Sequence, residues 1–87
     1  EIAHESIPVQ HSDLDLYNHV NHTSYIRWIE NSAAAQGIFP TQLAVNYLSE
    51  CKGGDVVYLT HLGHGNAPYF QGRVQDKLVF EAQIQFE

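Results

Sequence analysis

A short segment near the start of the chain gathers the residue types that carry acid–base chemistry. Residues 13–22 hold two acids, two amides and two histidines: Asp13, Asp15, Asn18, Asn21, His19 and His22. A carboxylate can attack a carbonyl carbon or activate water, and a histidine can give or take a proton because its ordinary pKa lies near neutrality. We therefore predict that the chemistry of this protein is located in residues 13–22.

An amphipathic helix is predicted directly after this segment, from Thr23 to about Gln36. Its apolar residues recur at i, i+3, i+4 and i+8, which places them on one helical face: Tyr25, Trp28, Ile29 and Ala33. Asn21 is a favourable N-cap, while Gly37 and Pro40 are typical of a helix end. The unpaired N–H groups of the helix N-terminus should therefore adjoin the polar segment.

The remainder of the chain has strand patterns. One strand is expected before the polar segment, at residues 7–11, where Pro8 favours an edge position. Four more are expected after the helix, at residues 43–48, 56–62, 69–75 and 80–86, separated by turns at 52–55, 63–66 and 76–77. Gly72 interrupts the fourth strand of the five and indicates a bulge. This order predicts an α+β fold, an antiparallel sheet with one helix on one face.

Length and composition limit the number of domains and the classes of function that this chain can have. Eighty-seven residues support one domain, residues 1–87. The net charge of −6, with four Lys and Arg residues in all, argues against binding to nucleic acid, which requires clustered positive charge. No apolar run approaches the roughly 20 residues of a membrane span, and no signal segment opens the chain, so we expect a cytoplasmic protein. The single cysteine, Cys51, cannot form an internal disulfide.

Three segments together resemble a known family. They are the Asp-rich run 13–22, the helical run 25–32 and the stretch 47–57, which contains the adjacent pair Glu50 and Cys51. This combination is similar to the hotdog-fold thioesterases, in particular the C-terminal hotdog unit of acyl-ACP thioesterases, over roughly residues 5 to 60. The resemblance implies a hotdog fold, in which an antiparallel β-sheet wraps around one long central α-helix.

The same resemblance implies an activity and a set of site residues. The activity is hydrolysis of fatty acyl-ACP thioesters to free fatty acid and carrier protein in fatty acid biosynthesis, without a cofactor. Asp15 would attack the thioester or activate water, and His19, Asn21 and Glu50 would complete the catalytic group. Tyr17 and Asn18 would contact substrate. Tyr17 departs from the family pattern, which usually has Asn there, and His22 stands where the family usually has a second Asn.

Each of these assignments has a structural alternative. Asp13 and Asp15 could bind only loop amides, as Asp commonly does in turns. Glu50 could be a solvated residue at a strand end. Cys51 lacks an activating base or positive field in the sequence and is interpreted as a bystander. The short spacings of His19 with His22, and of His61 with His64, fit no metal-ligand framework, so we predict no metal site.

Two other functions remain open at this point. One is a stand-alone acyl-CoA thioesterase acting as a homodimer, and the other is a non-catalytic hotdog module for dimerisation or acyl binding. The chain contains no methionine and begins within a predicted strand, so we expect it to be a piece of a longer protein. The expected partners are acyl carrier protein or acyl-CoA as substrate, and a second hotdog unit, either in the same chain or from a homodimer.

Overall fold

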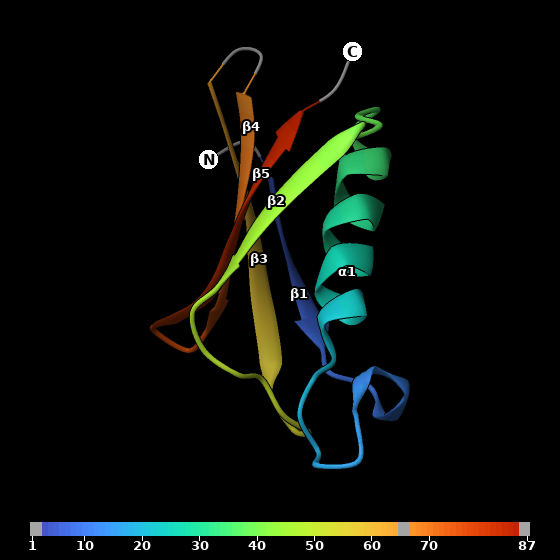
Figure 1. The fold of residues 1–87 in the computed structure, drawn as a ribbon. Coiled ribbons are helices and arrows are strands. Elements are labelled where there is room, and N and C mark those ends of the chain that lie inside the picture. Colours follow the sequence, from blue (N-terminus) through green and yellow to red (C-terminus); the bar gives the residue numbers. More distant parts are fainter. Residues whose placement is uncertain (1–2, 65–66, 86–87) are drawn as a thin grey trace.

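One helix lies against a five-stranded antiparallel sheet (Figure 1). The computed structural model describes residues 3–64 and 67–85. Their elements in chain order are β1 (Ala3–Pro8), a 3-10 turn (His11–Asp13), α1 (His22–Ala35), β2 (Gln42–Tyr47), β3 (Val56–His64), β4 (Ala67–Val74) and β5 (Lys77–Gln85). The strand order is β1-β3-β4-β5-β2, so β1 and β2 form the two edges. This architecture confirms the predicted α+β class.

Both ends of α1 are fixed by the residues that the sequence indicates. The side-chain oxygen of Asn21 accepts the N–H of Ser24 at 3.1 Å, as an N-cap does. At the other end Gly37 has a φ of +78°, and the N–H groups of Gly37 and Ile38 donate to the carbonyls of Ala34 and Ala33. This pair of bonds is a Schellman motif, which satisfies carbonyls that the last helical turn would leave unpaired.

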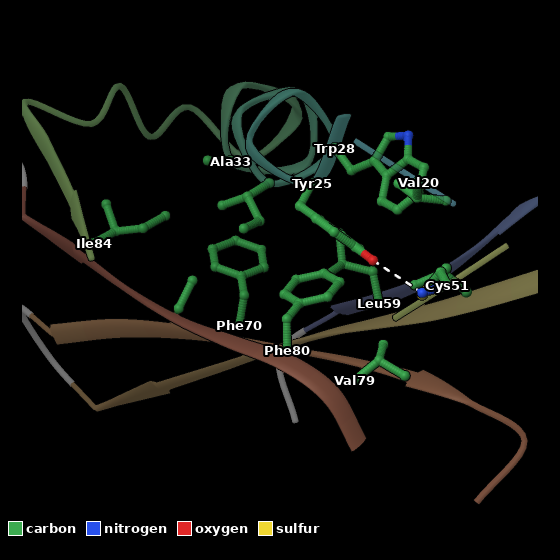
Figure 2. Close-up of a cluster of buried hydrophobic side chains, with 13 residues drawn as sticks. Val20, Tyr25, Trp28, Ala33, Cys51, Leu59, Phe70, Val79, Phe80 and Ile84 are labelled. Atoms are coloured by element: carbon green, nitrogen blue, oxygen red, sulfur yellow. Dashed lines mark hydrogen bonds between the residues drawn. The ribbon is translucent and has the colours of Figure 1, made fainter. Parts of the chain in front are cut away.

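The hydrophobic core fills the space between α1 and the sheet (Figure 2). The predicted helical face is buried: Tyr25, Trp28, Ile29 and Ala33. From the sheet, the alternate residues of β5 meet it: Phe80, Ala82 and Ile84. The apolar residues at helical spacing in α1 and at alternate positions in β5 therefore pack into one core. Phe86, which continues the alternation of β5, lies outside the described residues.

The strand bounds differ from expectation mainly at the first strand. The predicted strand at residues 7–11 is observed as Ala3–Pro8, because the chain turns after Val9 into the 3-10 turn. This turn is held by the carboxylate of Asp13, which accepts the N–H of Gln10 at 2.9 Å. Residues 63 and 64 of the predicted loop belong to β3, which reaches His64, and β4 begins at Ala67; residues 65 and 66 of that prediction lie outside the described residues.

Gly72 marks a bulge, as predicted. The register between β4 and β5 shifts between Gly72 and Arg73. Gly72 also lies directly against the buried ring of Phe80, where a Cβ atom would stand 2.1 Å from the ring carbon Cε1. Glycine is therefore required here by the close approach of a core side chain.

Within residues 3–64 and 67–85 there is no helix long and apolar enough to cross a lipid bilayer.

Candidate active site

A pocket of about 540 Å³ lies at the N-terminal end of α1. Three segments line it: the loop before the helix, the first turn of the helix, and the residues that end and follow β2. The lining residues are Asp15, His19, Val20, Asn21, His22, Tyr25, Tyr47, Leu48, Ser49 and Glu50. All four residues predicted to be catalytic, Asp15, His19, Asn21 and Glu50, are among them.

Backbone pairing between two distant loops brings Glu50 to the polar segment. The N–H of Val20 donates to the carbonyl of Cys51 at 2.8 Å, and the N–H of Gly53 donates to the carbonyl of Asn18 at 3.3 Å. His19 and Lys52 form an isolated antiparallel bridge between these bonds. These bonds hold Glu50, the residue before Cys51, beside His19, although no local pattern in the sequence indicates this contact.

Asp15 is held as a carboxylate at the surface of the pocket. Its Oδ1 accepts the backbone N–H groups of Tyr17 at 2.8 Å and His19 at 3.1 Å. These bonds, first that of His19 and then that of Tyr17, lower the pKa of Asp15 below its ordinary value. Both end on Oδ1, so Oδ2 stays available to water or substrate. The same bonds shape the loop, so Asp15 has a structural role whether or not it reacts.

His19 and Glu50 face each other across the pocket. The Nε2 atom of His19 lies 3.5 Å from Oε2 of Glu50, with side chains 42% and 74% exposed. At this exposure solvent screens the attraction, so the pair contributes little to folding stability. Its distance does allow Glu50 to orient the His19 ring, or to stabilise the ring once it is protonated.

Asn21 lines the pocket and at the same time caps the helix. Its oxygen accepts hydrogen bonds from the N–H of Ser24 and the hydroxyl of Thr23. Its Nδ2 donates to the carbonyl of Asp13 at 3.1 Å. The amide therefore has one N–H left for a substrate, and its observed role in this structure is to start α1 beside the pocket.

The two acids of the polar segment occupy different environments. Asp13 is only 2% exposed and lies outside the pocket lining. Its Oδ1 accepts a hydrogen bond from the hydroxyl of Ser24 at 3.0 Å and forms an ion pair with Arg27. Asp13 therefore anchors the loop to the helix and also binds the loop amide of Gln10, while Asp15 is the carboxylate that reaches solvent.

The two residues predicted to bind substrate lie at the loop tip. Tyr17 is 80% exposed. Asn18 has a φ of +64°, a left-handed conformation that Asn tolerates, and its side chain packs against Gly53, where a Cβ atom would stand 2.7 Å from Oδ1 of Asn18. Among the described side chains that line the pocket, neither Tyr17 nor Asn18 occurs. Contact with substrate stays a prediction for both.

An aromatic wall of the pocket was not anticipated. The rings of His22 and Tyr47 are stacked, with centroids 3.9 Å apart and planes at 8°. Tyr25 approaches Tyr47 at 5.5 Å. The sequence placed Tyr25 on the buried helical face, where it is, but this ring also lines the pocket. The alternation of residues 43–48 put Tyr47 on one strand face, yet only the tertiary fold shows that this face meets His22.

Cys51 lies behind the pocket, in the core. Its side chain is completely buried and does not line the pocket. Its N–H donates to the hydroxyl oxygen of Tyr25 at 3.1 Å (Figure 2). Burial raises the pKa of the Cys51 thiol, which disfavours the nucleophilic thiolate. Burial also raises the pKa of Tyr25.

In the part of the chain that the structure describes, no group of three or more His, Cys, Asp or Glu could hold a metal ion.

Sequence comparison places the chain in a family. The acyl-ACP thioesterase C-terminal domain family matches residues 1–87, the whole sequence given. The chain belongs to this family. Membership agrees with the resemblance carried by residues 13–22 and by Glu50 with Cys51, and it assigns the chain to the hotdog thioesterase superfamily. A search of curated protein sequences finds no match.

Solved structures agree with the family at the level of fold. The 12:0-ACP thioesterase from Umbellularia californica superposes with a TM-score of 0.83 and 18% identity, over 97% of this chain and 34% of that enzyme. A probable thioesterase from Escherichia coli gives 0.76 and 18%, over 93% and 77%. A thioesterase from Thermus thermophilus in complex with coenzyme A and Zn gives 0.75 and 18%, over 97% and 83%. These similarities establish the hotdog fold.

Proposed function

We propose that this protein hydrolyses fatty acyl-ACP thioesters to free fatty acid and carrier protein. The observation that supports this most strongly is the shared pocket: Asp15, His19 and Glu50 line one hollow at a helix N-terminus. Such a hollow offers a carboxylate, a proton carrier and a region of partial positive charge, which are the elements that thioester hydrolysis uses. Family membership supports ACP as the carrier.

In this proposal Asp15 acts on the thioester carbonyl carbon. It either takes a proton from an attacking water or attacks the carbon directly, forming an anhydride that water then cleaves. In both routes the carbon–sulfur bond breaks, the carrier leaves as its thiol, and the acyl group ends as a carboxylate. Near neutrality Asp15 is ionised, as a nucleophile must be, and the hydrogen bonds that lower its pKa make it a weaker base.

The other pocket residues would assist this step. His19, oriented by Glu50 at 3.5 Å, would supply a proton to the leaving thiolate or position the water. The N-terminus of α1, capped by Asn21, would polarise the carbonyl oxygen through its partial positive charge. Cys51 has no part in the proposed step, since its thiol is buried outside the pocket.

Acyl-CoA is the second candidate substrate. Its support is that similar structures include proteins in complex with coenzyme A, from Staphylococcus aureus and Thermus thermophilus. Because both carriers end in the same thioester-bearing arm, the pocket itself does not discriminate between them. A second hotdog unit, in the same chain or from another copy, would complete either assembly. A non-catalytic acyl-binding module is the third candidate.

Steady-state hydrolysis by the full-length protein would separate these candidates. Matched panels of acyl-ACP and acyl-CoA with the same acyl chains are compared by kcat/KM. We expect higher values with acyl-ACP at every chain length. Preference for acyl-CoA would replace ACP as the substrate, and an absence of hydrolysis with both panels, in protein that is folded and binds acyl ligands, would indicate the non-catalytic module.

A further inference from the structure

Glu50 reaches His19 on a short segment that leads from β2 to the polar segment. This stretch, residues 47–51, begins at the last residue of β2 and ends at Cys51, and we call it the Glu50 segment. The side chain of Glu50 is 74% exposed, so its own packing does not fix it at 3.5 Å from His19. Its position therefore depends on the backbone to either side of it.

The first part of the Glu50 segment is bound to the sheet and to the helix. The N–H groups of Leu48 and Ser49 donate to one carbonyl of β5, that of Val79, at 2.9 and 3.1 Å. Tyr47 is held by its ring, which stacks on His22 of α1 with centroids 3.9 Å apart. The chain therefore approaches the glutamate along a defined path.

Cys51, the residue after Glu50, is held through both of its backbone polar groups. Its carbonyl accepts the N–H of Val20 at 2.8 Å. Its N–H donates to the hydroxyl oxygen of Tyr25 at 3.1 Å, across the space between the segment and α1 (Figure 2). This N–H belongs to the planar peptide group that joins Glu50 to Cys51. The Tyr25 hydroxyl therefore holds the peptide group next to the Cα atom of Glu50.

The ring of Tyr25 is fixed by the core, so its hydroxyl has a defined place. Tyr25 is 2% exposed. Its ring meets Trp28 edge-on, with centroids 5.5 Å apart and planes at 89°, and its centroid lies 5.0 Å from that of Phe80. A phenylalanine would fill the same space. What the hydroxyl adds is a partner for the N–H of Cys51, which would otherwise be buried without a hydrogen bond.

We propose that Tyr25 is a positioning residue: its hydroxyl holds the peptide group that carries Glu50 and thereby sets the contact of Glu50 with His19. This inference rests on the proposed function, in which Glu50 orients the ring of His19. Tyr25 acts on the reaction through that pair and does not touch the reacting atoms. Cys51 contributes its backbone N–H, which every residue except proline offers, and its thiol has no part in the contact.

A ring resonance of His19 tests the positioning without any turnover. The Nε2 resonance is followed by NMR in full-length protein with isotope-labelled histidine, and Glu50→Gln gives its value once the carboxylate is gone. We expect Tyr25→Phe to move the resonance most of the way to that value. Cys51→Ala keeps the backbone N–H and should keep the wild-type resonance. A resonance that does not respond to Tyr25→Phe, or does not respond even to Glu50→Gln, would overturn the proposal.

Steady-state kinetics test the consequence for the reaction. Tyr25→Phe should lower kcat for acyl-ACP about tenfold and leave KM near the wild-type value, because the substrate contacts remain while the proton carrier is misoriented. In a Glu50→Gln background the same change should have no further effect, since no carboxylate is left to position. Additive losses in the double variant would overturn the proposal, because Tyr25 would then act by a route other than Glu50.

Tyr69→Phe is the matched control. It also removes a tyrosine hydroxyl that is hydrogen-bonded to a neighbour, Glu81, but Tyr69 does not line the pocket. On β4 it precedes Phe70, whose side chain is buried in the core, so Tyr69 lies on the opposite face of the sheet. The His19 resonance and kcat should both stay at their wild-type values in this variant.

Hydrogen exchange of the wild-type protein keeps the proposal testable if Tyr25→Phe does not fold. The backbone N–H of Cys51 should exchange slowly, as a hydrogen-bonded amide of the core does. Exchange at the rate of an exposed amide would overturn the proposal, since the hydroxyl of Tyr25 would then not hold this peptide group.

Failure of the positioning role and failure of the proposed function give different results. If the His19 resonance responds to Tyr25→Phe as expected while neither acyl-ACP nor acyl-CoA is hydrolysed, the proposed activity fails and the positioning of Glu50 stands. If the thioesters are hydrolysed but either the resonance or kcat is unchanged in Tyr25→Phe, the activity stands and the positioning role is overturned.

Discussion

Asp13 and Asp15 show how surroundings assign different tasks to the same side chain. Asp13 is buried against Ser24 and Arg27, where its charge is compensated and its geometry fixed. Asp15, two residues later, is exposed at the pocket with one oxygen bonded to loop amides. Asp13 ends the 3-10 turn and Leu14 is extended, so that Asp13 is buried and Asp15 is exposed. Sequence spacing alone placed both acids in the same segment and could not divide these roles.

Cys51→Ala tests the choice of reactive group at the residue scale. The thiol is buried, and its pKa is raised by that burial, so we expect the variant to retain kcat within about threefold of wild type. Truncation of a buried cysteine should cost about 1 kcal/mol of unfolding free energy. Hydrolysis assays and urea unfolding measure these two effects. A loss of several orders of magnitude in kcat would restore the cysteine as nucleophile.

At the scale of elements, local signals predicted α1 more accurately than the strands. The helix was expected at residues 23–36 and is observed at His22–Ala35, because Asn21 and Gly37 act within one turn of the ends they define. The first strand was misplaced: it ends at Pro8, and the chain then enters a 3-10 turn in which the carboxylate of Asp13 accepts the N–H of Gln10. A side-chain hydrogen bond across this turn sets the boundary, and the alternation of apolar residues does not indicate it.

The candidate site likewise contains some residues that local patterns predict and others that only tertiary contacts bring together. The polar segment and its position at a helix start could be predicted from residue types. The participation of Glu50 came from family resemblance, because its contact with His19 depends on pairing between loops that are distant in sequence. The stack of His22 on Tyr47 joins a helix to a strand edge, and no pattern within either element predicts it.

Gly72→Ala tests the packing of β4 against β5. The new Cβ would stand 2.1 Å from the buried ring of Phe80, so the ring or the strand must move. Overpacking of this kind costs about 1–3 kcal/mol of unfolding free energy. Urea unfolding of Gly72→Ala, Phe80→Leu and the double variant measures it. The two changes should be less than additive, because Phe80→Leu removes the clashing atoms; strict additivity would show that the contact is absent.

His61 should make stability depend on pH. Its side chain is 3% exposed, stacks on Phe70 at 4.6 Å, and contacts the amide oxygen of Gln36 through Nδ1. Among the described residues its Nε2 has no hydrogen-bond partner, and burial lowers the pKa of His61 below the ordinary 6.5. The unfolded chain therefore binds a proton more readily than the folded one. This contribution to stability is present above pH 6.5 and is lost as pH falls toward the folded pKa.

Urea unfolding as a function of pH checks this expectation. The free energy of unfolding should decrease from neutral to mildly acidic pH in the wild type and decrease less in His61→Phe, which keeps a ring against Phe70. His11→Gln is the control, since His11 is exposed, and it should keep the wild-type slope. Equal slopes in wild type and His61→Phe would remove His61 as the cause.

At the scale of the whole molecule, the sheet has two edges that are each paired on one side. Among the described strands, β1 pairs only with β3 and β2 pairs only with β5. Unpaired edge N–H and C=O groups favour association with another strand. Several large apolar side chains are exposed, among them Leu16 and Tyr17 in the loop before α1 and Leu48, which lines the pocket. A second hotdog unit would cover such surfaces, and the domain is small for a self-sufficient core.

Sedimentation equilibrium of residues 1–87 expressed alone tests this expectation. We predict that the chain dimerises through a sheet edge or aggregates when no second hotdog unit is present. The control is the full-length protein, which should have a defined stoichiometry. A stable monomer at high micromolar concentration, with cooperative unfolding, would contradict the requirement for a second unit.

We propose that the pocket of Asp15, His19 and Glu50 hydrolyses acyl thioesters, and Asp15→Asn in the full-length protein tests this activity most directly. Because the carboxamide oxygen can still accept the N–H groups of Tyr17 and His19, the thermal midpoint should be nearly unchanged, while kcat/KM for acyl-ACP falls by about 10²–10⁴-fold. Asp76→Asn, an exposed acid in the hairpin between β4 and β5, is the matched control and should retain wild-type activity. Wild-type turnover by folded Asp15→Asn would contradict the proposed mechanism.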